Sequence, residues 1–242
     1  MKKTLVILFS LIIIGCSKNA PELMKSAQSN LDQNEEDIAI KNLDLLISKF
    51  PDDSLASLAQ YKLVNIYKNW KHDPDKVFEA LNKTIDNYPK TLQAMQAKKE
   101  LGAFQEWVIN KAETLRKRKM TNESIKNLLY LVENFPSHEL ASKGQYILGD
   151  IYMNDLRDFE KALDEYRVVL NKYKGSKEEA LAQFMIGYIY ANILKNLDKA
   201  RSEYQVFLNR FPKHELFPSV KFEIDHLGKD INEIPALKHI TS

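Results

Sequence analysis

An aromatic residue followed by proline recurs along most of the chain, and this recurrence constrains the fold more than any other feature. The pair occurs at Phe50-Pro51, Tyr88-Pro89, Phe135-Pro136 and Phe211-Pro212, with the variant Tyr173-Lys174. Successive aromatic residues are 38, 47, 38 and 38 positions apart. Equal spacing in this range is typical of stacked supersecondary units. The sequence therefore predicts five copies of one unit, with an insertion of nine residues in the third.

Each unit ends in a stretch with helical periodicity. Positions eleven, seven and three residues before the aromatic residue, and the aromatic itself, share one face of a helix. The first three positions are occupied by Ala39, Leu43 and Ile47; Val77, Leu81 and Ile85; Ser124, Leu128 and Val132; Ala162, Tyr166 and Leu170; and Ala200, Tyr204 and Leu208. The pattern predicts an amphipathic helix in every unit, which the following proline ends.

The first half of the unit carries a second pattern, in which a small residue follows an aliphatic one and an aromatic comes three residues later. The matching segments are Leu63-Val64-x-x-Tyr67, Leu101-Gly102-x-x-Gln105, Leu148-Gly149-x-x-Tyr152 and Ile186-Gly187-x-x-Tyr190. A small residue lets two helices approach closely, and we expect the aromatic to fill the gap beside it. Each unit is therefore predicted to be a hairpin of two helices.

These positions together resemble the tetratricopeptide repeat, whose Leu-Gly-x-x-Tyr, alanine, aromatic and proline positions occur here in the same order. The resemblance covers residues 21–212 and is most specific in the last two units, with Gly187, Tyr190 and Ala200 in the fifth. Departures from the pattern are Val64, Gln105, Ser124 and Lys174. The resemblance implies an all-α fold, a right-handed α-solenoid of about five helix hairpins.

The end of the chain is predicted to close the solenoid. A helix over residues 215–227 would cover the apolar face that the last repeat otherwise leaves in water. The repeat domain is then 21–228, and residues 229–242, with little periodicity, form a tail. Capping signals precede four of the expected helices: Asp73 with Pro74, Asp158, Asn196, and Ser176 with Glu179.

The amino terminus, residues 1–15, is predicted to be a signal peptide. Lys2 and Lys3 precede an apolar run, Leu5–Ile14, that only Ser10 interrupts. A positive start followed by such a run is typical of a secretory leader. A helix needs roughly 20 apolar residues to cross a bilayer, so this run is too short for an ordinary transmembrane anchor.

The quartet Ile13-Ile14-Gly15-Cys16 resembles the bacterial lipobox. The resemblance implies that Cys16 is lipidated and becomes the first residue of the mature protein, with residues 16–20 as a short tether. Several acyl chains would hold the protein stably on a membrane. By the same resemblance, Ser17 suggests sorting to the outer membrane, with the repeats on its periplasmic face. The alternative is an ordinary secretory leader with an incidental cysteine.

Charge and cysteine content exclude several classes of protein. The chain has 35 basic and 33 acidic residues, and without Lys2 and Lys3 the mature chain is balanced, because 35 − 2 = 33. A neutral chain lacks the basic surface of a nucleic-acid-binding protein. The single cysteine excludes an intramolecular disulfide and a cysteine-rich zinc site.

We find no sequence pattern that requires catalysis. The nucleophile elbow, the phosphate loop and the zinc-protease helix are absent from the sequence. His138 and His214 stand at equivalent repeat positions, which favours a structural role near a helix end over a ligand or base. We therefore expect no metal, cofactor or small-molecule substrate, and a chain that is not an enzyme. The alternative is a glycan-cleaving enzyme that uses Asp150 and Glu106.

In tetratricopeptide arrays the first helix of each unit lines a concave groove. The resemblance implies these groove positions: Tyr61, Asn65, Asn69, Lys99, Trp107, Tyr146, Asp150, Asn154, Phe184, Tyr188 and Asn192. Aromatic and amide side chains are typical of a peptide-binding surface. Two alternatives stay open: Tyr61, Tyr146 and Phe184 pack between helices, or Asn69, Asn154 and Asn192 cap the first helices. The Lys-plus-Asn clamp of chaperone-tail-binding members is absent, because Ala103 stands four residues after Lys99.

A run of four basic residues, Arg116, Lys117, Arg118 and Lys119, is placed by the repeat pattern within the nine-residue insertion. One interpretation is a docking point for anionic headgroups or an acidic partner. The other is the solvated end of a long helix, where cations also favour the helix dipole. Trp107 lies earlier in the same predicted helix and adds an amphipathic side chain near the run.

Together these features predict a non-catalytic lipoprotein that binds another envelope protein or a segment of one. In lipobox, repeat number and length the chain is similar to the BamD-type lipoproteins of the outer-membrane β-barrel assembly machinery. The alternative is a coordinator of the Tol-Pal or peptidoglycan system, similar to YbgF-type repeat proteins. Those proteins carry an N-terminal coiled coil, and no heptad stretch precedes the repeats here.

Overall fold

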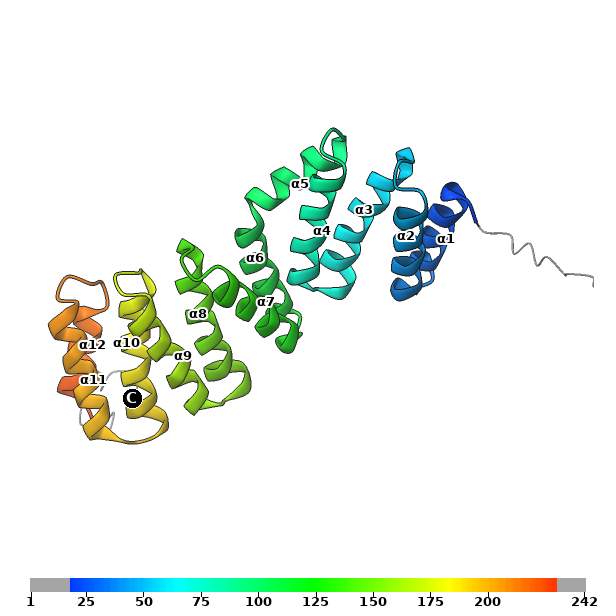
Figure 1. Cartoon of the computed structure of the whole chain (residues 1–242). Coiled ribbons are helices and arrows are strands. Elements are labelled where there is room, and N and C mark those ends of the chain that lie inside the picture. Colours follow the sequence, from blue (N-terminus) through cyan, green and yellow to red (C-terminus); the bar gives the residue numbers. More distant parts are fainter. Residues whose placement is uncertain (1–17, 230–242) are drawn as a thin grey trace, which may run out of the picture. The chain divides into compact units, whose positions relative to one another are not determined.

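The fold is all-α, as predicted. The computed structural model describes residues 18–229, which form twelve α-helices and three single-turn π-helices, with no β-strand in this range (Figure 1). The leader 1–15, the lipidation at Cys16 and tail residues 230–242 lie outside the described residues. No helix within 18–229 is long and apolar enough to cross a membrane. The chain divides into two compact units, which we describe separately.

The first unit contains the residues up to Lys71 together with Lys76–Leu101. Its helices are α1 (Ala20–Asp32), α2 (Glu36–Lys49), α3 (Ser54–Ile66), the π-helical turn η1 (Tyr67–Lys71), most of α4 (Pro74–Asn87) and α5 (Leu92–Gly102). Helix α1 packs against α2, and α2 against α3. Ala20, which the sequence places in the tether, is the first residue of α1, and the Asn19 side chain caps that helix.

The second unit contains His72–Asp75 and the residues from Gly102 onward. Its helices are α6 (Phe104–Lys117), α7 (Thr121–Asn134), α8 (Glu139–Ile151), η2 (Tyr152–Leu156), α9 (Phe159–Lys172), α10 (Glu178–Tyr188), η3 (Ile189–Ile193), α11 (Leu197–Arg210) and α12 (Phe217–Asp225). Each helix packs against the next along the chain, as expected of stacked hairpins. The predicted capping helix is α12, which buries Val220 against the last repeat.

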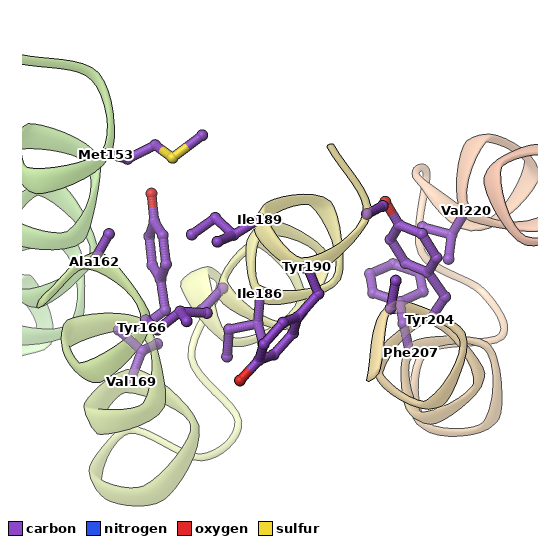
Figure 2. Packing of buried hydrophobic residues seen from close by; sticks show 14 of the residues in the cluster. Met153, Ala162, Tyr166, Val169, Ile186, Ile189, Tyr190, Tyr204, Phe207 and Val220 are labelled. Atoms are coloured by element: carbon purple, nitrogen blue, oxygen red, sulfur yellow. The ribbon is translucent and has the colours of Figure 1, made fainter. Parts of the chain in front are cut away.

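The predicted face of the second helices is buried. All ten side chains eleven and seven residues before the aromatic are at most 1% exposed; these are Ala39, Leu43, Val77, Leu81, Ser124, Leu128, Ala162, Tyr166, Ala200 and Tyr204. Burying one large aliphatic side chain contributes roughly 1.5–3 kcal/mol. In the second unit, Tyr204 and Phe207 of α11 lie beside Val220 of α12 (Figure 2). The repeat pattern therefore identifies the core.

Two glycines let the helices of a hairpin approach closely, but the aromatic beside them is not the predicted one. A Cβ added to Gly149 would lie 2.6 Å from the Tyr166 ring, and one added to Gly187 would lie 2.5 Å from the Tyr204 ring. The ring over each glycine thus comes from the second helix of the hairpin, and not from Tyr152 or Tyr190 three residues after it. Buried Gln145 and Gln183 donate hydrogen bonds from the same first helices to Glu165 and Glu203.

The turn between the two helices of every hairpin contains a non-glycine residue with positive φ. The five residues are Asn34, His72, Lys119, Arg157 and Lys195, with φ between 50° and 64°. Each stands sixteen residues before the aromatic of its own repeat. Asparagine and histidine are several-fold enriched in this left-handed region, whereas lysine and arginine are not. Repeats three to five therefore keep a basic residue where the backbone favours another type.

Replacing Lys195 by asparagine should raise the free energy of unfolding by about 0.5–1 kcal/mol, because asparagine tolerates the left-handed conformation at lower cost. Urea or thermal denaturation measures the change. Lys174→Asn, in a turn residue without positive φ, is the matched control and should change stability by less. An equal gain in both variants would show that the backbone conformation is not the cause.

The nine extra residues of repeat three lie elsewhere than predicted. Because Lys119 keeps the position of the other positive-φ residues, α6 and α7 form an ordinary hairpin, and the additional element is α5. The basic run 116–119 therefore ends the regular first helix and is not part of the insertion. Gly102 does not occupy the position of Gly149, since nothing lies within 4 Å of a Cβ added to it. The small residue where α6 meets α7 is Ala112, whose carbonyl accepts a hydrogen bond from Ser124.

Two of the predicted capping signals act as expected, and a third does not. The side chains of Asp158 and Asn196 accept hydrogen bonds from the backbone of the first turns of α9 and α11. Ser176 forms no capping box with Glu179, because its hydroxyl is buried without a partner in the described structure. The Glu179 carboxylate instead accepts a hydrogen bond from the Gly175 backbone, at 2.8 Å.

Candidate functional site

The predicted groove residues lie on first helices or on the π-helical turns that extend them, with one exception. In the second unit, α8 carries Tyr146 and Asp150, α10 carries Phe184 and Tyr188, and η2 and η3 carry Asn154 and Asn192. In the first unit, α3 carries Tyr61 and Asn65, and η1 carries Asn69. The exception is repeat three, where Lys99 is on α5 and Trp107 is on α6. These two residues do not share a helix, because the insertion separates them.

In the first unit, Tyr61 holds α5 against α3. Its hydroxyl donates a hydrogen bond to Glu100, and Lys68 contacts the other oxygen of that carboxylate at 2.6 Å. Burial, together with the Glu100 carboxylate, raises the pKa of Tyr61. Burial alone would raise the pKa of Glu100, but the hydrogen bonds from Lys68 and Tyr61 lower it overall. Tyr61 therefore contributes to the packing of α5 against α3. Lys99, next to Glu100 in the chain, is exposed.

In the second unit, the aromatic groove residues are half-buried. The ring centroid of Tyr146 lies 5.4 Å from that of Tyr166, and Phe184 is stacked on Tyr204 at 6.2 Å. Tyr188 lies 6.2 Å from Phe184. Burial, with the nearby Asp150 and Glu178 carboxylates, raises the pKa of Tyr146 to about 12. Both interpretations therefore apply to Tyr146 and Phe184, which pack between helices with one edge and reach the surface with the other.

The recurrent asparagines are exposed residues of the π-helical turns. The Asn154 amide donates to the Asp150 carboxylate at 2.6 Å, and the Asn192 amide donates to the Tyr188 carbonyl at 3.3 Å. Only Asn192 therefore bonds to a backbone carbonyl of the helix end, and Asn154 does not cap its helix. A π-helical turn adds one residue to a helix and is frequent at functional sites. Here it places the asparagine at the end of each of these first helices.

The basic run is divided between a structural residue and three exposed ones. Arg116 lies between Asp150, at 2.6 Å, and Asp155, so it joins α6 to α8 and η2. Burial lowers the pKa of Arg116, but the two carboxylates outweigh it and raise the pKa overall. Lys117, Arg118 and Lys119 are exposed and form no ion pair with other described residues. Asp150, predicted to face a partner, is paired with Arg116, which it shares with Asp155.

Several other residues that the sequence singled out have structural contacts within the described range. Trp107 contacts Phe104, with ring centroids 5.6 Å apart. His138 and His214 each use Nδ1 to accept a hydrogen bond from the backbone two residues later, which is the structural role predicted for them. Within 18–229 no three His, Cys, Asp or Glu side chains are grouped as a metal site. No sequence pattern identifies Glu100 or Asp155, because their partners lie 39 residues away.

A family model supports the repeat assignment in the last two repeats. The family model of the tetratricopeptide repeat matches residues 144–176 and 181–214, which contain most of α8–α9 and of α10–α11. The chain matches no curated protein. A similar solved structure is that of a tetratricopeptide repeat protein from Parabacteroides merdae ATCC 43184, at 14% identity and a TM-score of 0.37, over 85% of this chain and 72% of that one. Residues 144–176 and 181–214 are tetratricopeptide repeats.

Proposed function

We propose that the chain is a non-catalytic scaffold, anchored through Cys16 to the periplasmic face of the outer membrane, that binds a segment of another envelope protein during outer-membrane protein assembly. Tetratricopeptide repeats are protein-binding modules, and stacked repeats create extended binding surfaces. The lipobox-like quartet before Cys16 supports the anchor.

The observation that carries the proposal is the row of side chains on the first helices of repeats four and five. Tyr188 is half-buried. Asn154 and Asn192 are exposed and occupy equivalent positions in repeats four and five. Tyrosine fixed by its own packing supplies contact area at low entropic cost, and asparagine adds hydrogen bonds. Such a row suits an extended peptide segment better than a small molecule.

Affinity purification from crosslinked, detergent-solubilised envelopes tests the proposal. The variant carries Asn154→Ala, Tyr188→Ala and Asn192→Ala, and leaves Tyr146 unchanged because that residue packs on Tyr166. Loss of a tyrosine anchor costs about 2 kcal/mol at a binding hot spot, so affinity for the partner should fall roughly 30-fold and its recovery should fall clearly. In the same preparations, the protein carrying Cys16→Ser should be released from the membrane fraction by a high-salt wash, because it has no lipid anchor.

The matched control changes exposed polar residues on the second helices of the same repeats: Asn171→Ala, Gln205→Ala and Asn209→Ala. It should retain the partner. Barrel-assembly components among the crosslinked proteins would support a role in outer-membrane protein assembly. Tol-Pal components would instead support the alternative, a coordinator of the Tol-Pal system. Unchanged recovery with the first variant would contradict the surface assignment. Digestion of peptidoglycan by the native protein, lost in Asp150→Asn, Glu106→Gln, would overturn the scaffold.

A further inference from the structure

The turns that join the first to the second helix of each hairpin lie along one edge of the second unit (Figure 1). We call residues 117–120, 156–158 and 194–197 the turn edge. They share an edge because the helices alternate in direction along the stack. Arg116, at the end of α6, pairs with Asp155 in η2, so the first two of these turns are direct neighbours.

The turn edge gathers the exposed large apolar side chains of the second unit. Leu156, Leu194 and Leu197 are 45%, 38% and 40% exposed, and every other large aliphatic or aromatic side chain described in this unit is at least partly buried. Leu156 precedes Arg157, and Leu194 and Leu197 flank Lys195. Aliphatic side chains set among lysine and arginine are typical of surfaces that lie in a membrane interface.

The turn edge also carries an excess of positive charge. Lys117, Arg118, Lys119, Arg157 and Lys195 are exposed, and none of them forms an ion pair with another described residue. Carboxylates nearby are partly occupied: Asp155 pairs with Arg116, and Asp158 caps α9. Glu123, Glu160 and Asp198, in the first turns of α7, α9 and α11, are fewer than the five exposed cations.

Three of these five cations are held where the backbone opposes them. Lys119, Arg157 and Lys195 have φ of 64°, 55° and 54°, in a region that costs a residue of this type about 1–2 kcal/mol. The same position holds Asn34 and His72 in the first two repeats. Strained positions that a simple substitution would relieve are found at functional sites. The helix dipole returns only about 0.3–1 kcal/mol to a cation at the end of a helix. This is less than the backbone cost, so the charge points to a role outside the fold.

We propose that the turn edge docks onto an anionic lipid surface, where its lysine and arginine side chains contact phosphate groups and Leu156, Leu194 and Leu197 enter the headgroup layer. The opposite edge provides the contrast. Its Lys172, Lys174 and Lys177 are also exposed, but no large apolar side chain is exposed beside them. The docking does not depend on acylation of Cys16 or on a protein partner.

Vesicle binding by the full chain carrying Cys16→Ser tests the proposal, because no acyl chain can then be attached. Vesicles contain phosphatidylcholine alone or with three-tenths phosphatidylglycerol. The variant Lys119→Asn, Arg157→Asn, Lys195→Asn removes three charges at positions that asparagine tolerates, so it should gain stability while it loses binding. Each cation near an anionic surface contributes about fivefold, so affinity for the mixed vesicles should fall on the order of 100-fold. Leu156→Ser with Leu194→Ser should also weaken binding, by at least about tenfold.

The control Lys172→Gln, Lys174→Gln, Lys177→Gln makes the same change of net charge at the opposite edge and should alter affinity less than about threefold. A fluorophore on Leu194→Cys, the only thiol of the Cys16→Ser chain, should become accessible to lipid-borne quenchers, whereas one on Lys174→Cys should not. Equal losses with both triple variants would overturn the proposal, as would unchanged binding by the asparagine variant. If that variant binds vesicles normally but loses the crosslinked envelope protein, the turn edge is a protein-docking surface and the lipid assignment is wrong.

Discussion

Gly149→Ala and Gly187→Ala should each lower the free energy of unfolding of the second unit by about 3 kcal/mol, since inserting a group into a tightly packed helix crossing forces side chains and backbone apart. The added Cβ would lie 2.6 Å from the Tyr166 ring or 2.5 Å from the Tyr204 ring, and both rings are fully buried. Urea denaturation in a Trp70→Phe background measures the loss, because Trp107 then reports on the second unit alone.

Gly102→Ala is the matched control, as its added Cβ meets nothing within 4 Å. It should be neutral or stabilising by up to about 1 kcal/mol, the helix-propensity difference between alanine and glycine. Adding Tyr166→Leu to Gly149→Ala should restore part of the lost stability, since repeats one to three carry leucine at the equivalent position. A double variant no more stable than Gly149→Ala would show that the ring is not what opposes the methyl group.

The repeat hairpins could be predicted from the sequence because their determinants are local and periodic. Ala162 and Tyr166 of α9 are buried because helical spacing puts them on one face, and that spacing is visible in the chain itself. Repetition then excludes chance, since Ala200 and Tyr204 repeat the arrangement 38 residues later. The same periodicity places the candidate groove residues of α8 and α10 on first helices.

The position of the insertion could not be derived in this way. A spacing of 47 in place of 38 shows that nine residues are added but not where they are added. The Leu101-Gly102 pair resembles Leu148-Gly149, so the sequence pattern aligned these two segments although they are not equivalent in the structure. The positive φ of Lys119 shows how repeat three aligns with the other repeats. This backbone conformation cannot be recognised from the side chain, because lysine is not typical of positive φ.

The contacts that modify the candidate site were also hidden, because they join residues far apart in the sequence. In the sequence, Arg116 is the first residue of a basic run. In the structure, the packing of α6 on α8 brings it to Asp150. In the sequence, Tyr61 is predicted to be a groove residue. In the structure, the packing of α5 brings Glu100 to its hydroxyl. Periodicity identifies which face a residue occupies, but a long-range ion pair decides whether its charge remains available.

Arg210→Met should lower the free energy of unfolding by about 2 kcal/mol, because it leaves the buried Glu179 carboxylate without its cation. The Glu179 side chain is 6% exposed, accepts a hydrogen bond from Gly175 and pairs with Arg210 at the end of α11. Methionine keeps the apolar stem of arginine, so the loss reports on the charge. Arg210 is 41% exposed, and water can partly replace it, which keeps the loss below that of a fully buried pair.

Glu179→Gln provides the opposite arm of the test. It removes the same ion pair but leaves the cation on the exposed partner, which water solvates, and glutamine can still accept the hydrogen bond from Gly175. The expected loss is about 1 kcal/mol or less. Because the two variants break one pair from its two ends, their difference measures the cost of a buried unpaired carboxylate. Equal losses would mean that Glu179 is as well solvated as Arg210, contrary to its burial at the start of α10.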